Sequence, residues 1–192
     1  MDFTKTHLVL LIVSTALLFA PTTDAIRTPQ AHVWTICKPT TNPLLCYKTL
    51  LPKALSNPKF NMYKAVEVEI QEAQIQVVKT VAKIAGSIFT SSDKNIADAL
   101  KICKEQYGNM IDSIIETVTL VSNRNAVEAR FKFSAFISYH SSCEQAFIES
   151  KNANSPFADD AKVVYDLGAN ILDILKAIED RESRLSKSLT HN

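Results

Sequence analysis

The cysteines are the residues of this chain with the most reactive side chains. They are Cys37, Cys46, Cys103 and Cys143. A thiol attacks a substrate only when it is free and ionised, whereas an even number of cysteines in an oxidising compartment is typical of disulfides. We therefore expect two disulfides and no cysteine nucleophile. Four cysteines permit three pairings, so the pairing has to be argued from the elements that carry them.

Histidine, the usual general base and a common metal ligand, is sparse. Beyond residue 25 the histidines are His32, His140 and His191, and none of them pairs convincingly with a nucleophile. Di-iron helix bundles use paired Glu-x-x-His motifs, and this sequence has none. We predict no catalytic residue, no metal site and no cofactor, and we interpret His140 as a core or groove residue with a hydrogen-bond partner.

The first 25 residues are predicted to form a signal peptide. Residues 8–20 are an apolar run, too short to span a bilayer comfortably. Pro21 follows the run, and Thr23 and Ala25 place small residues at the positions that a signal peptidase recognises. The prediction is a secreted protein that has no membrane attachment after cleavage.

Residues 26–192 are predicted to form one domain, because no Gly-, Ser- or charge-rich linker divides them. The whole chain has 21 Lys and Arg against 20 Asp and Glu, a net charge of +1, with no basic block. This balance argues against nucleic acid or an anionic membrane as the partner. A partner would have to be recognised by shape.

The apolar residues recur with helical periodicity, which predicts an all-α fold. The chain has only three glycines, and the periodic segments contain no internal proline. Four apolar stripes follow one another, each with steps of three or four residues. They are Val66, Ile70, Ala73, Val77, Val81, Ile84 and Ile88; Ile96, Leu100, Cys103, Tyr107, Met110, Ile114, Val118 and Val121; Ala129, Phe133, Phe136, His140, Cys143 and Phe147; and Val164, Leu167, Ile171, Ile174 and Ile178.

Capping residues separate these stripes. The second helix is predicted to start after the residues 91–93, which are plausible N-caps, and the third at Asn125, with Glu128 completing a capping box. Ser155 is the predicted N-cap of the fourth helix, with Pro156 at its first position. Because the connections are short, successive helices should be antiparallel. The prediction is an up-down-up-down four-helix bundle.

The cysteine pairing follows from this arrangement. Cys103 lies twenty residues before Asn123 and Cys143 lies twenty residues after it. With a turn at Asn123, both cysteines lie about 30 Å from the turn at 1.5 Å per residue, level with each other on facing helices. Cys103 should therefore bond to Cys143, which leaves Cys37 to bond to Cys46.

Several segments then resemble the plant invertase and pectin methylesterase inhibitor family. Residues 37–46, CKPTTNPLLC, are similar to its amino-terminal motif, and residues 99–107, ALKICKEQY, to its second-helix pattern. Residues 133–135 and 142–144 resemble its Ser-Ala-Ala and Thr-Cys-Glu/Asp segments, and residues 169–172 stand where the family often has Ser-Asn-Ala-Leu. These motifs lie in the family's order and cover nearly the whole of residues 26–192.

The resemblance implies a helical hairpin at residues 26–55, stapled by Cys37 and Cys46 and projecting from the bundle. It also implies a one-to-one complex with an enzyme of the plant cell wall, in the apoplast. Family invertase inhibitors insert a Pro-Lys-Phe motif that lies just before the third bundle helix. Here residues 126–128 read Ala-Val-Glu, and the only Pro-Lys-Phe is at residues 58–60, before the first bundle helix.

Family pectin methylesterase inhibitors instead lay a polar face of the bundle over the substrate cleft. Ser142 retains the hydroxyl that these inhibitors usually supply as threonine, although the fifth cysteine common among them is missing. We therefore predict a pectin methylesterase as partner, with an acid invertase as the alternative. The expected contacts are Ser141 and Ser142, together with Asn109 and Asp112 of the neighbouring helix; solvated helix surface is the ordinary interpretation of each.

Two other classes of function stay open. A small-molecule carrier needs an internal cavity, whereas the bulky Phe131, Phe133, Phe136 and Phe147 predict a filled core. A purely structural protein of the cell wall is not excluded by the sequence.

Overall fold

The computed structural model describes residues 28–150 and 154–190, and these residues form helices without a strand. The helices are α2 (Pro29–Cys37), α3 (Pro43–Leu55), α4 (Met62–Thr90), α5 (Lys94–Ser122), α6 (Ala126–Glu149) and α7 (Ala158–Thr190). The predicted all-α class is confirmed. In the described part of the chain, no helix is long and apolar enough to cross a membrane. The predicted signal peptide, residues 1–25, and His191 lie outside the described residues.

Short polar side chains start the helices of the bundle. Asn61 Oδ1 accepts a hydrogen bond from the backbone N–H of Lys64 at 3.1 Å, and Asp93 caps α5 in the same way. Asn125 Oδ1 accepts from the N–H of Glu128 at 3.2 Å, as predicted. The other half of the predicted capping box is wrong, because the N–H of Asn125 donates to the Leu120 carbonyl at 2.9 Å instead of to the Glu128 side chain.

The start of α7 is also later than predicted. Ser155 Oγ accepts from the N–H of Phe157 at 3.3 Å, and the Ser155 carbonyl accepts from Ala158, so the chain makes a turn before it enters the helix. In the first turn of α7, Asp160 forms ion pairs with Lys79 and Lys83 of α4. The hydrogen bond from Lys83 lowers the pKa of the Asp160 carboxyl. These contacts hold the start of α7 against α4.

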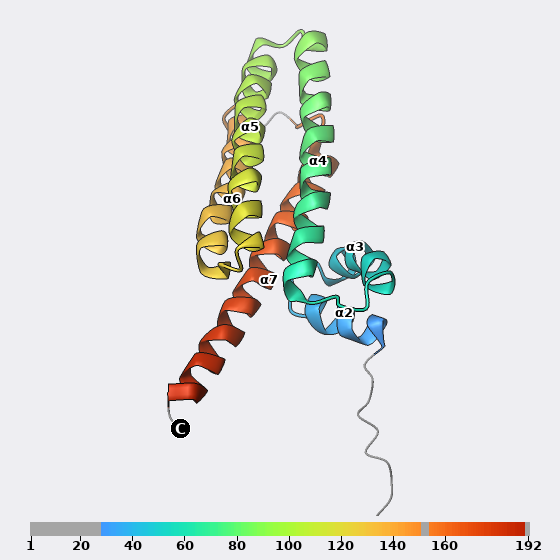
Figure 1. Cartoon of the computed structure of the whole chain (residues 1–192). Coiled ribbons are helices and arrows are strands. Elements are labelled where there is room, and N and C mark those ends of the chain that lie inside the picture. The colour runs from blue at the N-terminus through green and yellow to red at the C-terminus, as the bar shows by residue number, and fades with distance from the viewer. Residues whose placement is uncertain (1–27, 151–153, 191–192) are drawn as a thin grey trace, which may run out of the picture.

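Helices α4 to α7 form the bundle, with α4 beside α5 and α7, and α6 beside α5 and α7 (Figure 1). Successive helices run in opposite directions, so the predicted up-down-up-down order is confirmed. All members of the third and fourth stripes are buried. The assignment of Val118 to the second stripe is wrong, because Val118 is 48% exposed and Thr117 is buried in its place. Position 117 continues the helical period between Ile114 and Val121, and the Thr117 hydroxyl donates to the Ser113 carbonyl at 2.7 Å.

The hairpin of α2 and α3 lies beside one end of α4 and packs against α4 and α7 (Figure 1). The turn between α2 and α3 is hydrogen-bonded to α7. Asp173 Oδ2 accepts hydrogen bonds from the backbone N–H and the hydroxyl of Thr41 at 2.7 and 2.8 Å. The side-chain amide of Asn170, which is fully buried, accepts from the N–H of Asn42 and donates to its carbonyl, at 2.8 and 3.1 Å. The hairpin is therefore docked as well as projecting.

Helices α6 and α7 approach closely at Gly168. A Cβ atom placed on Gly168 would lie 2.6 Å from Cε1 of Phe136, which is fully buried. By contrast, a Cβ atom on Gly86 in α4 would meet nothing within 4 Å. Gly168 is thus required by packing, whereas Gly86 is not.

We expect Gly168→Ala to destabilise the protein by about 1–3 kcal/mol, because the new methyl group must displace Phe136 in a packed core. The matched variant Gly86→Ala should stabilise it by about 0.5–1 kcal/mol, the usual gain for alanine in a helix interior. Denaturant unfolding of both variants checks the pair. Equal free energies of unfolding would contradict the close approach of α6 and α7.

Glu69 of α4 is fully buried, and neither of its carboxylate oxygens has a hydrogen-bond partner among the described residues. Burial, with a smaller contribution from the charge of Glu72, raises the pKa of Glu69 from 4.5 to about 8. An ionised carboxylate without partners is costly in an apolar interior, so the folded state keeps Glu69 protonated.

This group should make the folded state less stable as the pH rises. Between pH 4.5 and about 8 the unfolded chain loses the Glu69 proton while the folded chain retains it. The free energy of unfolding should then fall by up to ~1.4 kcal/mol for each pH unit. Glu69→Gln should flatten this slope, whereas Glu105→Gln, at an exposed position, should not. If the free energy of unfolding fell with pH equally in the wild type and in Glu69→Gln, the raised pKa of Glu69 would be contradicted.

Candidate partner-binding face

Both predicted disulfides are present, and every cysteine is paired. Cys37 bonds to Cys46 within the hairpin, with 5.5 Å between their Cα atoms. Cys103 of α5 bonds to Cys143 of α6, with an S–S distance of 2.04 Å and 4.5 Å between the Cα atoms. The second bond fixes the register of the antiparallel pair α5 and α6. Their residues can therefore be placed level with one another by counting from it.

The sides of α5 and α6 that point away from the core form one surface, which we call the outer face. Its residues recur at helical spacing on each helix and are exposed, apart from Asn109, which is partly buried. The outer face consists of Ile102, Glu105, Asn109, Asp112 and Glu116 from α5, and Phe131, Ser134, Ser138, Ser141, Ser142, Gln145 and Glu149 from α6.

The four residues predicted as contacts all lie on this face. Ser141 and Ser142 line a shallow depression of about 470 Å³. Asn109 and Asp112 do not line it: counted from the disulfide, they lie about 7 and 12 Å further along α5 than the position level with Ser142. Sequence reasoning missed the other lining residues. They are Ile102, Gln145, Ala146 and Glu149.

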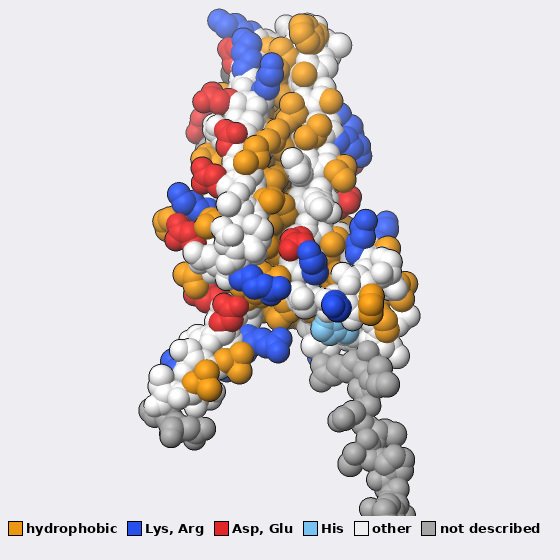
Figure 2. Space-filling view, viewed as in Figure 1, with side chains coloured by type: hydrophobic (Ala, Val, Ile, Leu, Met, Phe, Trp, Pro, Cys, Tyr) orange, Lys and Arg blue, Asp and Glu red, His pale blue; other side chains and the backbone are white. Residues whose placement is uncertain are grey.

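The outer face presents hydroxyl, amide and carboxylate groups. The Ser142 hydroxyl donates to the Ser138 carbonyl at 2.9 Å, which leaves its oxygen free to accept a hydrogen bond. Glu116 forms a long ion pair with Lys132, at 3.8 Å. Glu105 and Asp112 have no ion-pair partner within the described ranges. Acidic side chains gather on the α5 and α6 side of the bundle (Figure 2).

Below the face, His140 is 2% exposed, and its Nε2 lies 2.9 Å from the Ala161 carbonyl. The prediction of a core histidine with a hydrogen-bond partner is confirmed. Its Nδ1 lies 3.5 Å from a carboxylate oxygen of Glu144. In residues 28–150 and 154–190, no group of three or more His, Cys, Asp and Glu side chains is arranged to hold a metal ion.

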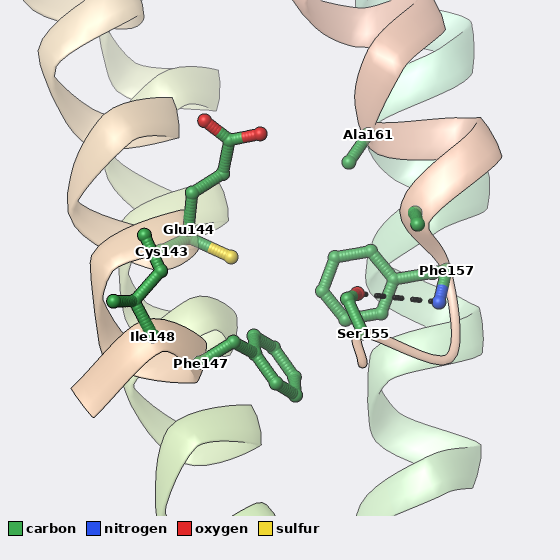
Figure 3. Close-up of a pocket in the computed structure, with 8 residues that line it drawn as sticks. Cys143, Glu144, Phe147, Ile148, Ser155, Phe157 and Ala161 are labelled. Carbon is green, nitrogen blue, oxygen red and sulfur yellow. Dashed lines mark hydrogen bonds between the residues drawn. The ribbon is translucent and has the colours of Figure 1, made fainter. Parts of the chain in front are cut away.

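A second pocket, of about 310 Å³, lies between α6 and the start of α7. Figure 3 shows Phe147 and Phe157 pointing into it from opposite sides, and their ring centroids are 5.8 Å apart. Deeper in the bundle the rings of Phe133 and Phe136 stack with centroids 4.8 Å apart. Phe131 was wrongly predicted to fill the core, because its ring is 70% exposed on the outer face.

The sequence profile of the plant invertase/pectin methylesterase inhibitor family matches residues 31–174. A protein of Arabidopsis thaliana, provisionally named pectinesterase/pectinesterase inhibitor 26, is 27% identical over 140 residues, which are 67% of this chain and 14% of that protein. The chain thus spans only a small part of the length of this curated relative.

Two crystal structures of an inhibitor of pectin methylesterase from Arabidopsis have a similar fold. A mutant form superposes with a TM-score of 0.64 at 21% identity, covering 76% of this chain and 95% of that one. A second structure, from Arabidopsis thaliana, superposes with a TM-score of 0.58 at 20% identity and the same coverage. At this level of identity the likeness supports the fold alone.

Proposed function

Because the chain belongs to the plant invertase/pectin methylesterase inhibitor family, we propose that it binds a plant pectin methylesterase one to one and covers the substrate cleft of the enzyme. Members of the family are inhibitors rather than enzymes. We propose the same for this protein, with no catalysis of its own and no cofactor.

The observation that carries the proposal is the outer face on the stapled pair α5 and α6. Ser142 precedes Cys143 directly, so the contact region is attached to the disulfide that fixes the register of the two helices. A surface held in this way loses little conformational entropy when it docks. A face of ordinary interface size can then exclude a polymeric substrate from a cleft without supplying any chemistry.

The turn between α5 and α6 favours pectin methylesterase over acid invertase. Ala126, the first residue of α6, is buried, and Glu128 donates its N–H to the cap Asn125. Residues 126–128 read Ala-Val-Glu, so this turn lacks the Pro-Lys-Phe that the invertase inhibitors insert. Acid invertase remains the second candidate, since the family name covers both enzymes.

The Pro-Lys-Phe at residues 58–60 has a structural role. The N–H of Lys59 donates to Asn57 Oδ1 at 3.0 Å, and the Phe60 ring meets the edge of His32 with centroids 6.5 Å apart. The first contact is local to the connection between α3 and α4, and the second joins this connection to α2 of the hairpin. This Pro-Lys-Phe precedes α4, whereas the motif of the invertase inhibitors lies just before the third bundle helix.

We further propose that residues 1–25 are a signal peptide and that the protein acts in the cell wall or apoplast. Proteins of the family are extracellular. The two disulfides are consistent with this location, because they persist in oxidising compartments and are rare in the cytosol.

Titration of the protein, residues 26–192, against a purified plant pectin methylesterase and an acid invertase tests the function. We expect methylesterase activity to fall to an end point at one equivalent, from acidic to neutral pH, and invertase activity to be unchanged. Inhibition of invertase with untouched methylesterase activity would reverse the assignment.

Ser142→Glu should weaken inhibition of the methylesterase at least tenfold, because it adds a charge and bulk at the centre of the contact region. Ser183→Glu is the matched control, since Ser183 is exposed on α7 away from the outer face. It should inhibit like the wild type. Full inhibition by Ser142→Glu would move the interface to another face of the bundle.

A further inference from the structure

We propose that Phe131 is the apolar anchor with which the outer face binds the target pectin methylesterase; this inference rests on the proposed function. Its ring is 70% exposed, although a phenylalanine is normally placed in the interior of a helical bundle. Phe131 is out of phase with the core stripe of α6, whose members Ala129 and Phe133 are fully buried. The fold gains nothing from an exposed aromatic ring at this position.

The neighbours of Phe131 determine where its side chain points. Arg130 forms an ion pair with Glu179 of α7 at 2.7 Å. Lys132 is directed to α5, where its carbonyl accepts from the Ser113 hydroxyl and its ammonium group pairs with Glu116. Phe131 lies between one residue that faces α7 and another that faces α5. It therefore points outward, away from both partner helices.

Phe131 is continuous with the proposed contact region. Residues 131, 138, 142, 145 and 149 follow one another at steps of seven, four, three and four, which places them along one side of α6. Phe131 lies eleven residues before Ser142, about 16 Å along the helix. An interface of ordinary size, about 800 Å² on each partner, is large enough to include both residues. Val127, also exposed, lies one turn before Phe131 and extends the apolar area.

The surroundings of Phe131 fit a specific enzyme cleft. Aromatic side chains are enriched at the centre of protein interfaces, where a few of them supply most of the binding energy, and polar residues form the rim. Here the border on the α5 side consists of Glu105, Asp112 and Glu116, the last of which is paired with Lys132. Pectin is a polymer of galacturonic acid, so a cleft that binds it must accommodate carboxylates. The excess of acidic side chains on this side of the apolar centre is complementary to such a cleft.

The test compares Phe131→Ala with Phe89→Ala. Phe89 is 89% exposed in the last turn of α4, at the other end of the bundle and outside the outer face, so it controls for the loss of an exposed ring. We expect Phe131→Ala to raise the inhibition constant for the methylesterase at least tenfold and Phe89→Ala to leave it unchanged. Phe131→Leu should retain most of the inhibition. The melting temperatures of all three variants should match that of the wild type, since neither ring is packed in the core.

The outcomes separate this inference from the proposed function. Inhibition by the wild type and equally by Phe131→Ala would overturn the anchor and leave the function standing. Equal weakening by Phe131→Ala and Phe89→Ala would also overturn it, because the effect would then belong to exposed rings in general. Absence of inhibition by the wild type would overturn both.

Discussion

The disulfide between Cys103 and Cys143 is the constraint on which the rest of the arrangement depends. It joins the two helices whose outer sides form the contact face, and the Cα atoms of its cysteines are only 4.5 Å apart. In the chain-entropy model, a loop of this length contributes roughly 4 kcal/mol of stability. Its second effect is geometric: one bond in the core fixes which residue of α5 lies level with which residue of α6. A binding surface composed of two helices needs this register, because a shift of one residue turns each side chain by about 100°.

The hairpin depends on a different kind of contact. Some of its apolar residues, such as Val33 and Leu50, are buried, whereas Leu44 is exposed. Burial of apolar surface alone therefore does not fix how the hairpin is oriented on the bundle. Instead, the backbone groups of Thr41 and Asn42, in the turn between α2 and α3, form hydrogen bonds with side chains of α7. Hydrogen bonds have a required direction, and leaving a buried amide such as that of Asn170 without partners is costly. Polar contacts thus orient the hairpin, while its own disulfide keeps α2 and α3 together.

The sequence was sufficient to predict those features that follow from periodicity and counting. The bundle order, the members of the third and fourth stripes and both disulfides follow from spacing. The start of α7 does not, because a serine followed by proline is compatible with a turn as well as with a cap. Thr117 was missed because its polar side chain is acceptable in the core only when its hydroxyl reaches the carbonyl one turn earlier, which the helix itself provides. Asn109, Asp112, Ser141 and Ser142 were placed on one face by resemblance, whereas the depression beside Ser142 depends on how α5 and α6 pack and was seen only in the structure.

The hydrophobicity of a residue and its position in the helical period carry different information. At Phe131 they disagree, because the residue is apolar but does not lie on the buried side of its helix. An apolar residue in phase with its stripe is explained by the core, so it says nothing about a partner. An apolar residue out of phase has been left in water, at a cost that folding does not recover. Val118 is of this kind but is 48% exposed, so about half of its surface is still covered. Phe131 is 70% exposed, and it shares its side of α6 with the hydroxyls of Ser138 and Ser142. Phase, read together with the chemistry of the neighbours, therefore identifies a surface residue whose apolar character is explained best by a partner.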